Sequence, residues 1–450
     1  MKKLTFLGAA GTVTGSNFLL EKEGAGSVLI DMGMFQGLSN AVELNSRPLN
    51  FNPREVTAVI LTHAHLDHCG RLPLLVKNGY AGNIYATEAT KVLTELVLLD
   101  AAKIAKEDPK VPVLYDESDV SALLARMVTV DYHQNFKAGP FEASLCDAGH
   151  ILGSASCQIV DAGDVESEKV VFSGDLGNSP EDIVKPTESF ENVDVVVMES
   201  TYGGRVHPND KPAETLAEEI NEVEKTGSVL LIPSFSLERA QVLLHLLDHL
   251  KADQKIRNDT QVFLDSPMAV RATNIYKLFK GLYNKKLALH ASNNDPFDFA
   301  GLHLVEDYRK SKKIANMPGA KVIIAGSGMM TGGRILQHAK KYLPHANNRL
   351  LIVGYMGEGT TGRKILEGSK KVDIEGTEVE VNANVSEISS LSAHADEPRL
   401  IDWLKEMGSF KKIYLVHGED EARGKLRQKI RNDLQFDYVV LPIVDQAVTI

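Results

Sequence analysis

Three histidines and one aspartate stand within six residues, directly after a short apolar run, and this feature restricts the chain's possible folds most strongly. Residues 57–61 (TAVIL) have the composition of a buried strand, and THAHLDHCG follows at residues 62–70. Imidazoles and carboxylates together suit Zn²⁺ or a similar divalent ion. A chance His-rich turn is the alternative, and it explains a lone histidine better than a cluster at a strand end.

The spacing within this cluster predicts two metal positions. His63 and His65 are separated by one residue, so on an extended segment they point the same way. Asp67 and His68 come a turn later and aim at a neighbouring position. One metal is therefore not enough to use all four side chains.

Three further predicted strand ends carry single ligand-type residues, namely Asp31, His150 and Asp175. For Asp31, a role in the turn or a hydrogen bond to a ligand histidine is as plausible as direct metal contact. The predicted sets are His63, His65 and His150 for one metal, Asp67 and His68 for the other, and Asp175 as a bridge. Two ions roughly 3.5–4 Å apart suit hydrolysis at a phosphoryl or acyl centre.

Composition describes an ordinary globular chain with room for two domains, with 450 residues of which 43% are hydrophobic. No apolar run approaches the roughly 20 residues of a bilayer span, and the N-terminus lacks a signal-type segment, so we expect a cytoplasmic protein without a membrane partner. The three cysteines predict neither a disulfide framework nor a Cys-type zinc site. The net charge of −11 argues against a wholly basic nucleic-acid surface.

The periodicity predicts an α/β protein with two kinds of sheet. Strand-like runs recur without helices before residue 61, and again near residues 144–146, 157–160 and 169–172, with helices at 71–77 and 87–106 between the sets, which indicates an αββα sandwich. Beyond about residue 205 strands near 228–233, 261–265, 321–326 and 349–354 alternate with helices, including 237–250 and 269–280, which predicts a parallel sheet. A further strand-type pattern covers residues 379–385.

The second metal is short of ligands in the motifs described so far. Two C-terminal histidines, His394 in SAHAD and His417 in VHGE, lie beside strand-like runs and are candidates. Both could be structural, but they occur where the chain returns to the first domain, which favours a functional role.

Taken together, these residues resemble a known family. The motif at residues 63–68 with Asp31, His150 and Asp175 looks like the metallo-β-lactamase fold. Glu199 in MESTYG, with His394 and His417, resembles the extra motifs of its beta-CASP branch, which comprises RNA and DNA nucleases such as RNase J and the nuclease subunit of the mRNA 3′-end cleavage machinery.

The resemblance implies a fold, an activity and roles for residues. Residues 1–205 and 378–450 would form the lactamase domain, and residues 206–377 the inserted beta-CASP domain. His417 would be a ligand of the second metal, and Glu199 would orient His394, which donates a proton to the leaving oxygen. Asp67 would serve both as ligand and as catalytic residue.

A Gly-rich segment offers a candidate phosphate site. Residues 322–333 (VIIAGSGMMTGG) read as strand, loop and helix start, where backbone N–H groups can bind an anion. The candidate residues are Gly326, Ser327, Gly328 and Met329. Arg239, at the start of a predicted helix, could reach a phosphate, or could form a surface ion pair with a neighbouring glutamate.

The leading hypothesis is a ribonuclease with two zinc ions per chain, manganese being possible, that hydrolyses phosphodiester bonds of single-stranded RNA in RNA processing or decay. A small-molecule hydrolase of the same fold, a DNA nuclease, and an inert scaffold that only binds RNA are the alternatives. The choice between endonuclease and 5′-exonuclease action is left open, as is a homodimer.

Overall fold

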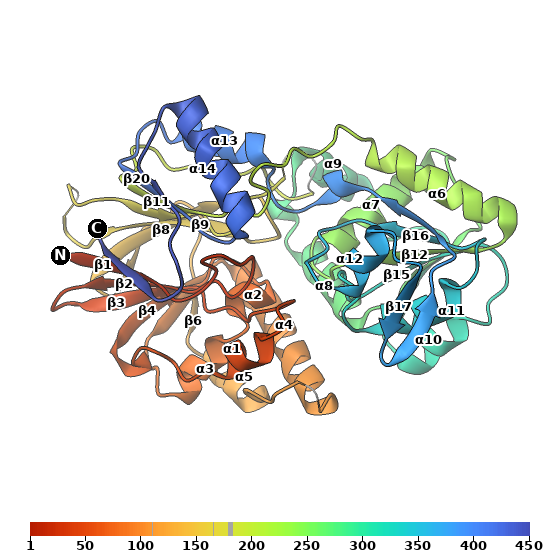
Figure 1. The fold of residues 1–450 in the computed structure, drawn as a ribbon, viewed down its shortest axis with the longest axis horizontal. Coiled ribbons are helices and arrows are strands. Elements are labelled where there is room, and N and C mark those ends of the chain that lie inside the picture. Colours follow the sequence, from red (N-terminus) through yellow and green to blue (C-terminus); the bar gives the residue numbers. More distant parts are fainter. Residues whose placement is uncertain (110, 165, 179–182) are drawn as a thin grey trace. The chain divides into compact units, whose positions relative to one another are not determined.

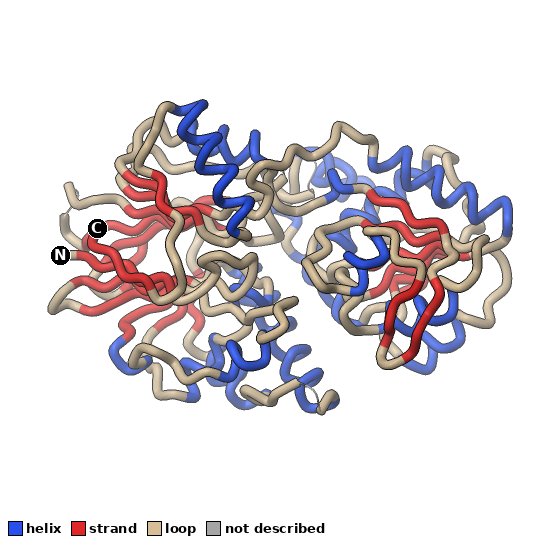
Figure 2. Tube along the Cα trace, viewed as in Figure 1, coloured by secondary structure: helices blue, strands red, loops and turns tan. Residues whose placement is uncertain are grey.

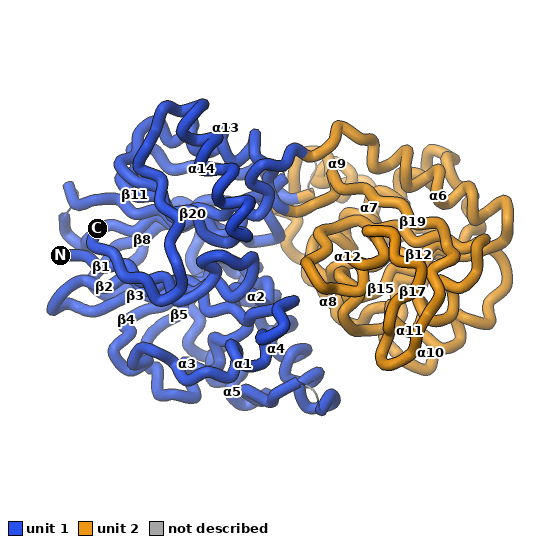
Figure 3. Tube along the Cα trace, in the orientation of Figure 1, with its two compact units in different colours: residues 1–180, 184–206, 394–450 blue, residues 181–183, 207–393 orange. Residues whose placement is uncertain are grey.

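The computed structural model describes residues 1–109, 111–164, 166–178 and 183–450. The chain divides into two compact units, of which unit 1 contains residues 1–180, 184–206 and 394–450 and unit 2 contains residues 181–183 and 207–393 (Figure 3). Unit 2 is therefore inserted between two parts of unit 1. Its far end differs from the predicted domain boundary, because residues 378–393 belong to unit 2 rather than to the returning segment.

Unit 1 is built on two seven-stranded sheets (Figure 1). The first has the strand order β22 (Gln446–Thr449), β1 (Lys2–Phe6), β2 (Phe18–Lys22), β3 (Gly26–Ile30), β4 (Val56–Ile60), β5 (Asn83–Ala86) and β6 (Met127–Thr129). The second has the order β21 (Val439–Val440), β20 (Lys412–Leu415), β11 (Val195–Met198), β10 (Val170–Phe172), β9 (Ala155–Asp161), β8 (Phe141–Asp147) and β7 (Phe136–Ala138).

Each sheet changes from antiparallel to parallel pairing along its width. Strands β3 to β6 pair in parallel, and so do β10, β11, β20 and β21. Neighbouring parallel strands end at the same edge of a sheet, so the loops that follow them lie close together. The predicted site residues occur in these loops.

The two sheets face each other across one apolar core. Phe6 packs on Tyr414 with ring centroids 5.1 Å apart, and Phe18 packs on Phe172 at 5.9 Å, so aromatic rings join the two inner faces. Burying a side chain of this size stabilises the fold by roughly 1.5–3 kcal/mol. This arrangement confirms the predicted sandwich.

Helices cover the outer faces of unit 1 (Figure 2). They are α1 (Ala41–Ser46), η1 (Pro53–Glu55), α2 (Leu66–Cys69), α3 (Leu72–Lys77), α4 (Glu88–Glu107), α5 (Glu117–Leu124), α13 (Glu397–Glu406) and α14 (Asp420–Leu434). The start of α4 is set by the local sequence. The Thr87 hydroxyl accepts a hydrogen bond from Thr90 N and so caps the helix. Within the described ranges, no helix combines the length and apolar character needed to cross a bilayer.

Unit 2 contains a six-stranded sheet in which every pair is parallel, as predicted. Its order is β14 (Leu302–Leu304), β13 (Gln261–Leu264), β15 (Lys321–Ala325), β12 (Val229–Pro233), β16 (Arg349–Ile352) and β19 (Asn384–Glu387). The helical segments of this unit are α6 (Pro212–Thr226), α7 (Arg239–Ala252), α8 (Pro267–Leu278), η2 (Lys280–Leu282), α9 (Lys285–Asn293), α10 (Tyr308–Ile314), α11 (Arg334–Tyr342), α12 (Thr361–Leu366) and η3 (Ser389–Leu391).

The strand-type pattern at residues 379–385 corresponds to parts of two strands rather than to one. Two strands occur there, β18 (Thr377–Glu380) in a hairpin with β17 (Lys371–Ile374), and β19 at the edge of the parallel sheet. Val381 and Ala383 between them are buried in the core of unit 2, and the pairing of β19 with β16 places this stretch in unit 2.

Candidate metal centre

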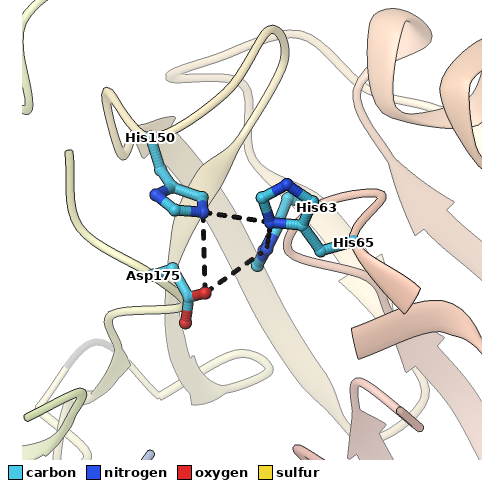
Figure 4. Close-up of side chains that lie close together, drawn as sticks. All are labelled: His63, His65, His150 and Asp175. Atoms are coloured by element: carbon cyan, nitrogen blue, oxygen red, sulfur yellow. Dashed lines mark hydrogen bonds and ion pairs between the residues drawn. The ribbon is translucent and has the colours of Figure 1, made fainter. Parts of the chain in front are cut away.

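Four of the predicted ligands converge in unit 1 (Figure 4). His65 Nδ1 lies 3.1 Å from both His63 Nε2 and His150 Nε2. Asp175 Oδ2 lies 3.5 Å from His63 Nε2 and 3.6 Å from His150 Nε2. These ring nitrogens and the carboxylate therefore surround one small space, as ligands of a single ion do.

The predicted second set gathers around the other oxygen of the same carboxylate. Asp175 Oδ1 lies 3.2 Å from His68 Nε2 and 3.6 Å from His417 Nε2. His417 Nε2 is also 3.8 Å from Asp67 Oδ2. Asp175 thus stands between two ligand sets, which is the bridging position that the sequence predicts for it.

Strand ends explain why residues far apart in the chain meet. Asp175 follows β10 and His417 follows β20, two strands of the parallel part of one sheet. His63 follows β4 in the facing sheet, and His150 lies in the connection between β8 and β9. The loop that carries Asp175 passes very close to the loop that carries His150. A Cβ on Gly177 would stand 1.7 Å from the carbonyl oxygen of Gly149.

Asp31 contacts His68, one of the predicted ligands. Its Oδ2 lies 2.7 Å from His68 Nδ1, and it accepts hydrogen bonds of 2.8 Å from both the backbone N–H and the hydroxyl of Thr62. Of the roles left open by the sequence, the geometry supports the hydrogen bond to a ligand. Such a carboxylate fixes the ring orientation and directs the opposite nitrogen, Nε2, toward the metal position.

His394 pairs with Glu199 and also lies within reach of Asp175 and His417, since one ligand atom from each of His394, Asp175 and His417 lies within 4.8 Å of the other two. His394 Nδ1 lies 3.1 Å from Glu199 Oε1, whereas its distance to Asp175 Oδ2 is 3.9 Å. Glu199 is fully buried, and its Oε1 and Oε2 also accept hydrogen bonds from Leu176 N and Thr201 N. A carboxylate fixed in this way can orient the imidazole and favour its protonated form.

The donor set fits divalent metal ions on two grounds. His65 Nδ1 lies at hydrogen-bonding distance from both His63 Nε2 and His150 Nε2. A ring nitrogen offers either one proton or one lone pair, so His65 Nδ1 can form a good hydrogen bond with only one of the two. Asp175 Oδ1 is buried and accepts no hydrogen bond of good geometry from any residue that the structure describes. A metal ion would satisfy both the lone pairs and this oxygen.

Electrostatics agrees with that assignment. Burial lowers the pKa of His65 and of His417 to about 4, so both rings are neutral at pH 7, the form that binds metal. Burial opposes protonation of His68, but the carboxylates of Asp175 and Asp31 raise its pKa well above the usual range. This part of unit 1 therefore favours added positive charge.

His394, like His68 and unlike His65 and His417, has a raised pKa. Burial lowers its pKa, but the charge of Glu199 and the hydrogen bond with it outweigh that effect, so the pKa rises to about 9. The ring is therefore protonated at neutral pH and can act as a proton donor.

Sequence reasoning missed three hydroxyl residues of the centre. Ser16 Oγ lies 2.9 Å from His417 Nδ1, Thr62 Oγ1 lies 3.1 Å from His63 Nδ1, and Thr201 Oγ1 lies 3.5 Å from His394 Nδ1. Thr62 and Thr201 flank motif residues and could have been found from that position. Ser16 carries no such signal, because its loop is distant in sequence from His417.

The candidate phosphate-binding residues lie in unit 2. The loop that contains Gly326 to Met329 joins β15 to α11, as predicted, but the Ser327 hydroxyl itself accepts hydrogen bonds from Thr331 N and Gly332 N. Among the predicted residues, the Ser327 N–H already donates a hydrogen bond to the carbonyl oxygen of Gly332. Arg239 begins α7 and is only 4% exposed, so the alternative of a surface ion pair does not describe it.

Three family models match the chain. They are described as the metallo-beta-lactamase superfamily at residues 10–219, the Beta-Casp domain at residues 240–365, and the Zn-dependent metallo-hydrolase RNA specificity domain at residues 378–442. The last model begins at the predicted boundary near 378, whereas the compact units divide at 393 and 394.

Curated relatives cover nearly the whole chain. Ribonuclease TTHA0252 of Thermus thermophilus is 40% identical over 93% of this chain and 94% of its own. The transcription termination factor FttA of Methanocaldococcus jannaschii is 31% identical over 93% of this chain and 67% of its own. Integrator complex subunit 11 of Danio rerio is 30% identical over 96% of this chain and 71% of its own.

A solved structure shares the fold. A protein of unknown function from Enterococcus faecalis V583 aligns over 99% of both chains with a TM-score of 0.54 at 13% identity. The metallo-β-lactamase fold implies divalent metal binding, and the His and Asp sets described above could hold such ions. On the family models and the relatives together, the chain belongs to the Beta-Casp family of the metallo-β-lactamase superfamily.

Proposed function

We propose that this protein is a zinc-dependent ribonuclease that hydrolyses phosphodiester bonds of single-stranded RNA, with two ions per chain. The observation that carries the proposal is the position of Asp175, whose two carboxylate oxygens face two different sets of imidazoles. The ribonuclease named among the relatives and the RNA specificity model at residues 378–442 support RNA as the substrate. Action inside the cytoplasm, and a homodimer, stay predictions.

Each residue of the centre then has a task. His63, His65 and His150 would hold one ion and Asp67, His68 and His417 the other, with Asp175 shared between them. When bound, such ions supply Lewis-acid activation of water and neutralise charge on a phosphate group. Asp31 keeps the His68 ring in its binding orientation.

Lewis-acid activation of water does not protonate the leaving group, and we assign that step to His394. Hydrolysis of RNA expels a ribose oxygen, which is a poor leaving group unless it is protonated as the bond to phosphorus breaks. The protonated His394 ring carries the required proton, and Glu199 holds that ring through Nδ1. A small-molecule hydrolase of the same fold would not need this buried pair.

The proposal is tested by incubating the full chain with 5′-labelled single-stranded RNA and with DNA of the same sequence. We expect cleavage of the RNA, loss of cleavage after treatment with a chelator, and recovery on addition of zinc, with manganese as a second ion. Intact RNA, or equal cleavage by the chelator-treated protein, contradicts the proposal. Cleavage of DNA alone would support the alternative of a DNA nuclease.

A further inference from the structure

Another group of histidines lies in unit 2, in two helices that the metal centre does not include. His245 and His249 are one turn apart on α7, and His290 lies on α9. One ligand atom from each of the three rings lies within 4.8 Å of the other two. Residues four apart share one face of a helix, so α7 presents two imidazoles to the same point.

The distances within this surface His cluster match metal coordination. His290 Nδ1 lies 3.3 Å from His245 Nδ1. Two ligands of a tetrahedral zinc ion with Zn–N bonds of roughly 2.0–2.1 Å are about 3.3–3.4 Å apart. A hydrogen bond between two neutral rings would give a similar distance. It would involve only His245 and His290, however, and would not account for the position of His249 beside them.

Asp248 settles which nitrogen of His290 faces the other rings. Asp248 Oδ2 lies 2.9 Å from His290 Nε2, on the side of the ring away from His245. A carboxylate there fixes the proton on Nε2 and leaves the Nδ1 lone pair free for a metal, as carboxylates behind zinc-bound histidines do. The Nδ1 lone pair of His290 is therefore directed at His245.

Access and packing agree with a metal site. His249 is exposed and His245 and His290 are half-buried, so an ion can reach the rings from solvent. Helix α9 has nine residues, of which only Leu287 and Ala291 are buried. Those two contribute little burial, and a metal bridge to α7 would hold the helix in place.

We infer that His245, His249 and His290 bind one divalent transition-metal ion, such as Zn²⁺, Ni²⁺ or Co²⁺, with Asp248 orienting His290, and that this ion fastens α9 to α7. Three imidazoles select such ions over Mg²⁺ or Ca²⁺, which prefer oxygen ligands. The site is separate from the proposed ribonuclease activity, so failure of one proposal leaves the other standing.

The test compares the full-length wild type with His249→Ala and His290→Ala, and with His345→Ala, which removes an exposed histidine of the same unit. Each chain is dialysed against the same buffered free zinc concentration, and bound ions per chain are counted by elemental analysis. We expect the first two variants to bind one ion fewer than the wild type and the His345→Ala control. Added zinc should raise the unfolding temperature of the wild type more than that of His249→Ala.

Asp248→Asn tests the orienting role. The amide cannot hold the His290 proton as a carboxylate does, so zinc affinity at this site should fall roughly 10–100-fold. Cobalt added to the chelator-treated wild type should give the visible absorption of tetrahedral sites, and His249→Ala should lack the part of that absorption that comes from this site. Equal ion counts in all four chains, or the same cobalt spectrum in His249→Ala, overturn the inference. Because His249 is exposed, His249→Ala should fold and give an interpretable result even if His290→Ala does not fold.

Discussion

Asp175 is the residue at which the two ligand sets meet. Burial alone would favour its neutral acid, but the imidazoles of His417, His68 and His63 hold the pKa of its carboxyl well below the usual range. The carboxylate is therefore ionised, and each of its oxygens faces a different set of rings. The proposed bridging role requires an ionised carboxylate of this kind, with one oxygen directed at each set of rings.

His394→Ala is expected to lower the rate of RNA cleavage by roughly 10²–10⁴-fold, the usual contribution of a general acid. The metal content should not change, because no proposed ligand set requires this ring. A nitrophenyl phosphodiester has a good leaving group that needs little protonation, so its hydrolysis should suffer far less. Rates on both substrates and elemental analysis check this prediction.

Glu199→Gln serves as the companion variant and should show a milder form of the same pattern, since it weakens the support of the His394 ring without removing the ring. If His394→Ala loses a metal, or slows both substrates equally, His394 is a ligand or a structural residue and the proton donor must be another group.

At the residue scale, the sequence predicts the candidate ligands better than it predicts the hydroxyl groups that contact them. The spacing of His63, His65, Asp67 and His68 is specific enough to indicate two metals, and the structure brings these residues together with His150 and His417. Hydroxyl groups such as Ser16 Oγ give no comparable pattern, because serine and threonine occur in every kind of loop. Only the fold shows which of them reach a ligand.

At the scale of elements, the beginning of α7 combines an unusual backbone with a buried acid. Glu238, just before the helix, has φ of 61° and is fully buried, and its Oε2 accepts a 2.6 Å hydrogen bond from the Tyr276 hydroxyl. Burial raises the pKa of Glu238 to about 7, against the effects of Tyr276 and of neighbouring Arg239. The packing of α7 on α8 therefore includes a group that titrates near neutrality.

Stability should consequently fall as the pH rises past this group. The unfolded chain releases this proton near pH 4.3, whereas the folded chain keeps it up to about pH 7, so the folded state binds more protons between these values. The free energy of unfolding should therefore decrease across this window, by on the order of 3 kcal/mol. Urea unfolding of the wild type and of Glu238→Gln, at pH 5.5 and at pH 8.5, measures the part of this decrease that falls above pH 5.5, which is about 2 kcal/mol.

Glu238→Gln cannot ionise and should become more stable relative to the wild type at the higher pH. A stability difference that is the same at both pH values would show that Glu238 is not protonated in the folded chain.

Helices with a clear periodicity of apolar residues could be predicted from the sequence. Short strands whose position depends on pairing with distant segments could not. The helix predicted at 87–106 is observed as Glu88–Glu107, because both its apolar face and its Thr87 cap are local signals. The pattern at residues 379–385 alternates like one strand, yet β18 and β19 pair with different partners. Which partner a short strand finds depends on tertiary structure rather than on its own sequence.

At the scale of the whole molecule, the insertion of unit 2 has a simple consequence for the centre. His63, His150 and Asp175 come before the insertion, whereas His394 and His417 come after it. The proposed second ligand set and the proposed proton donor are therefore completed only when the two parts of unit 1 meet. The sequence predicted this return, but the exact end of unit 2 depended on the pairing of β19.

Cleavage of labelled single-stranded RNA by Asp175→Asn, in the presence of zinc, tests the central claim most directly. Asp402→Asn on α13, whose side chain is 65% exposed and pairs with Lys405, is the matched control. Loss of the shared carboxylate should abolish cleavage, because both ligand sets lose their common member, while the control should cleave like the wild type. Cleavage by Asp175→Asn at the rate of the control would contradict the account.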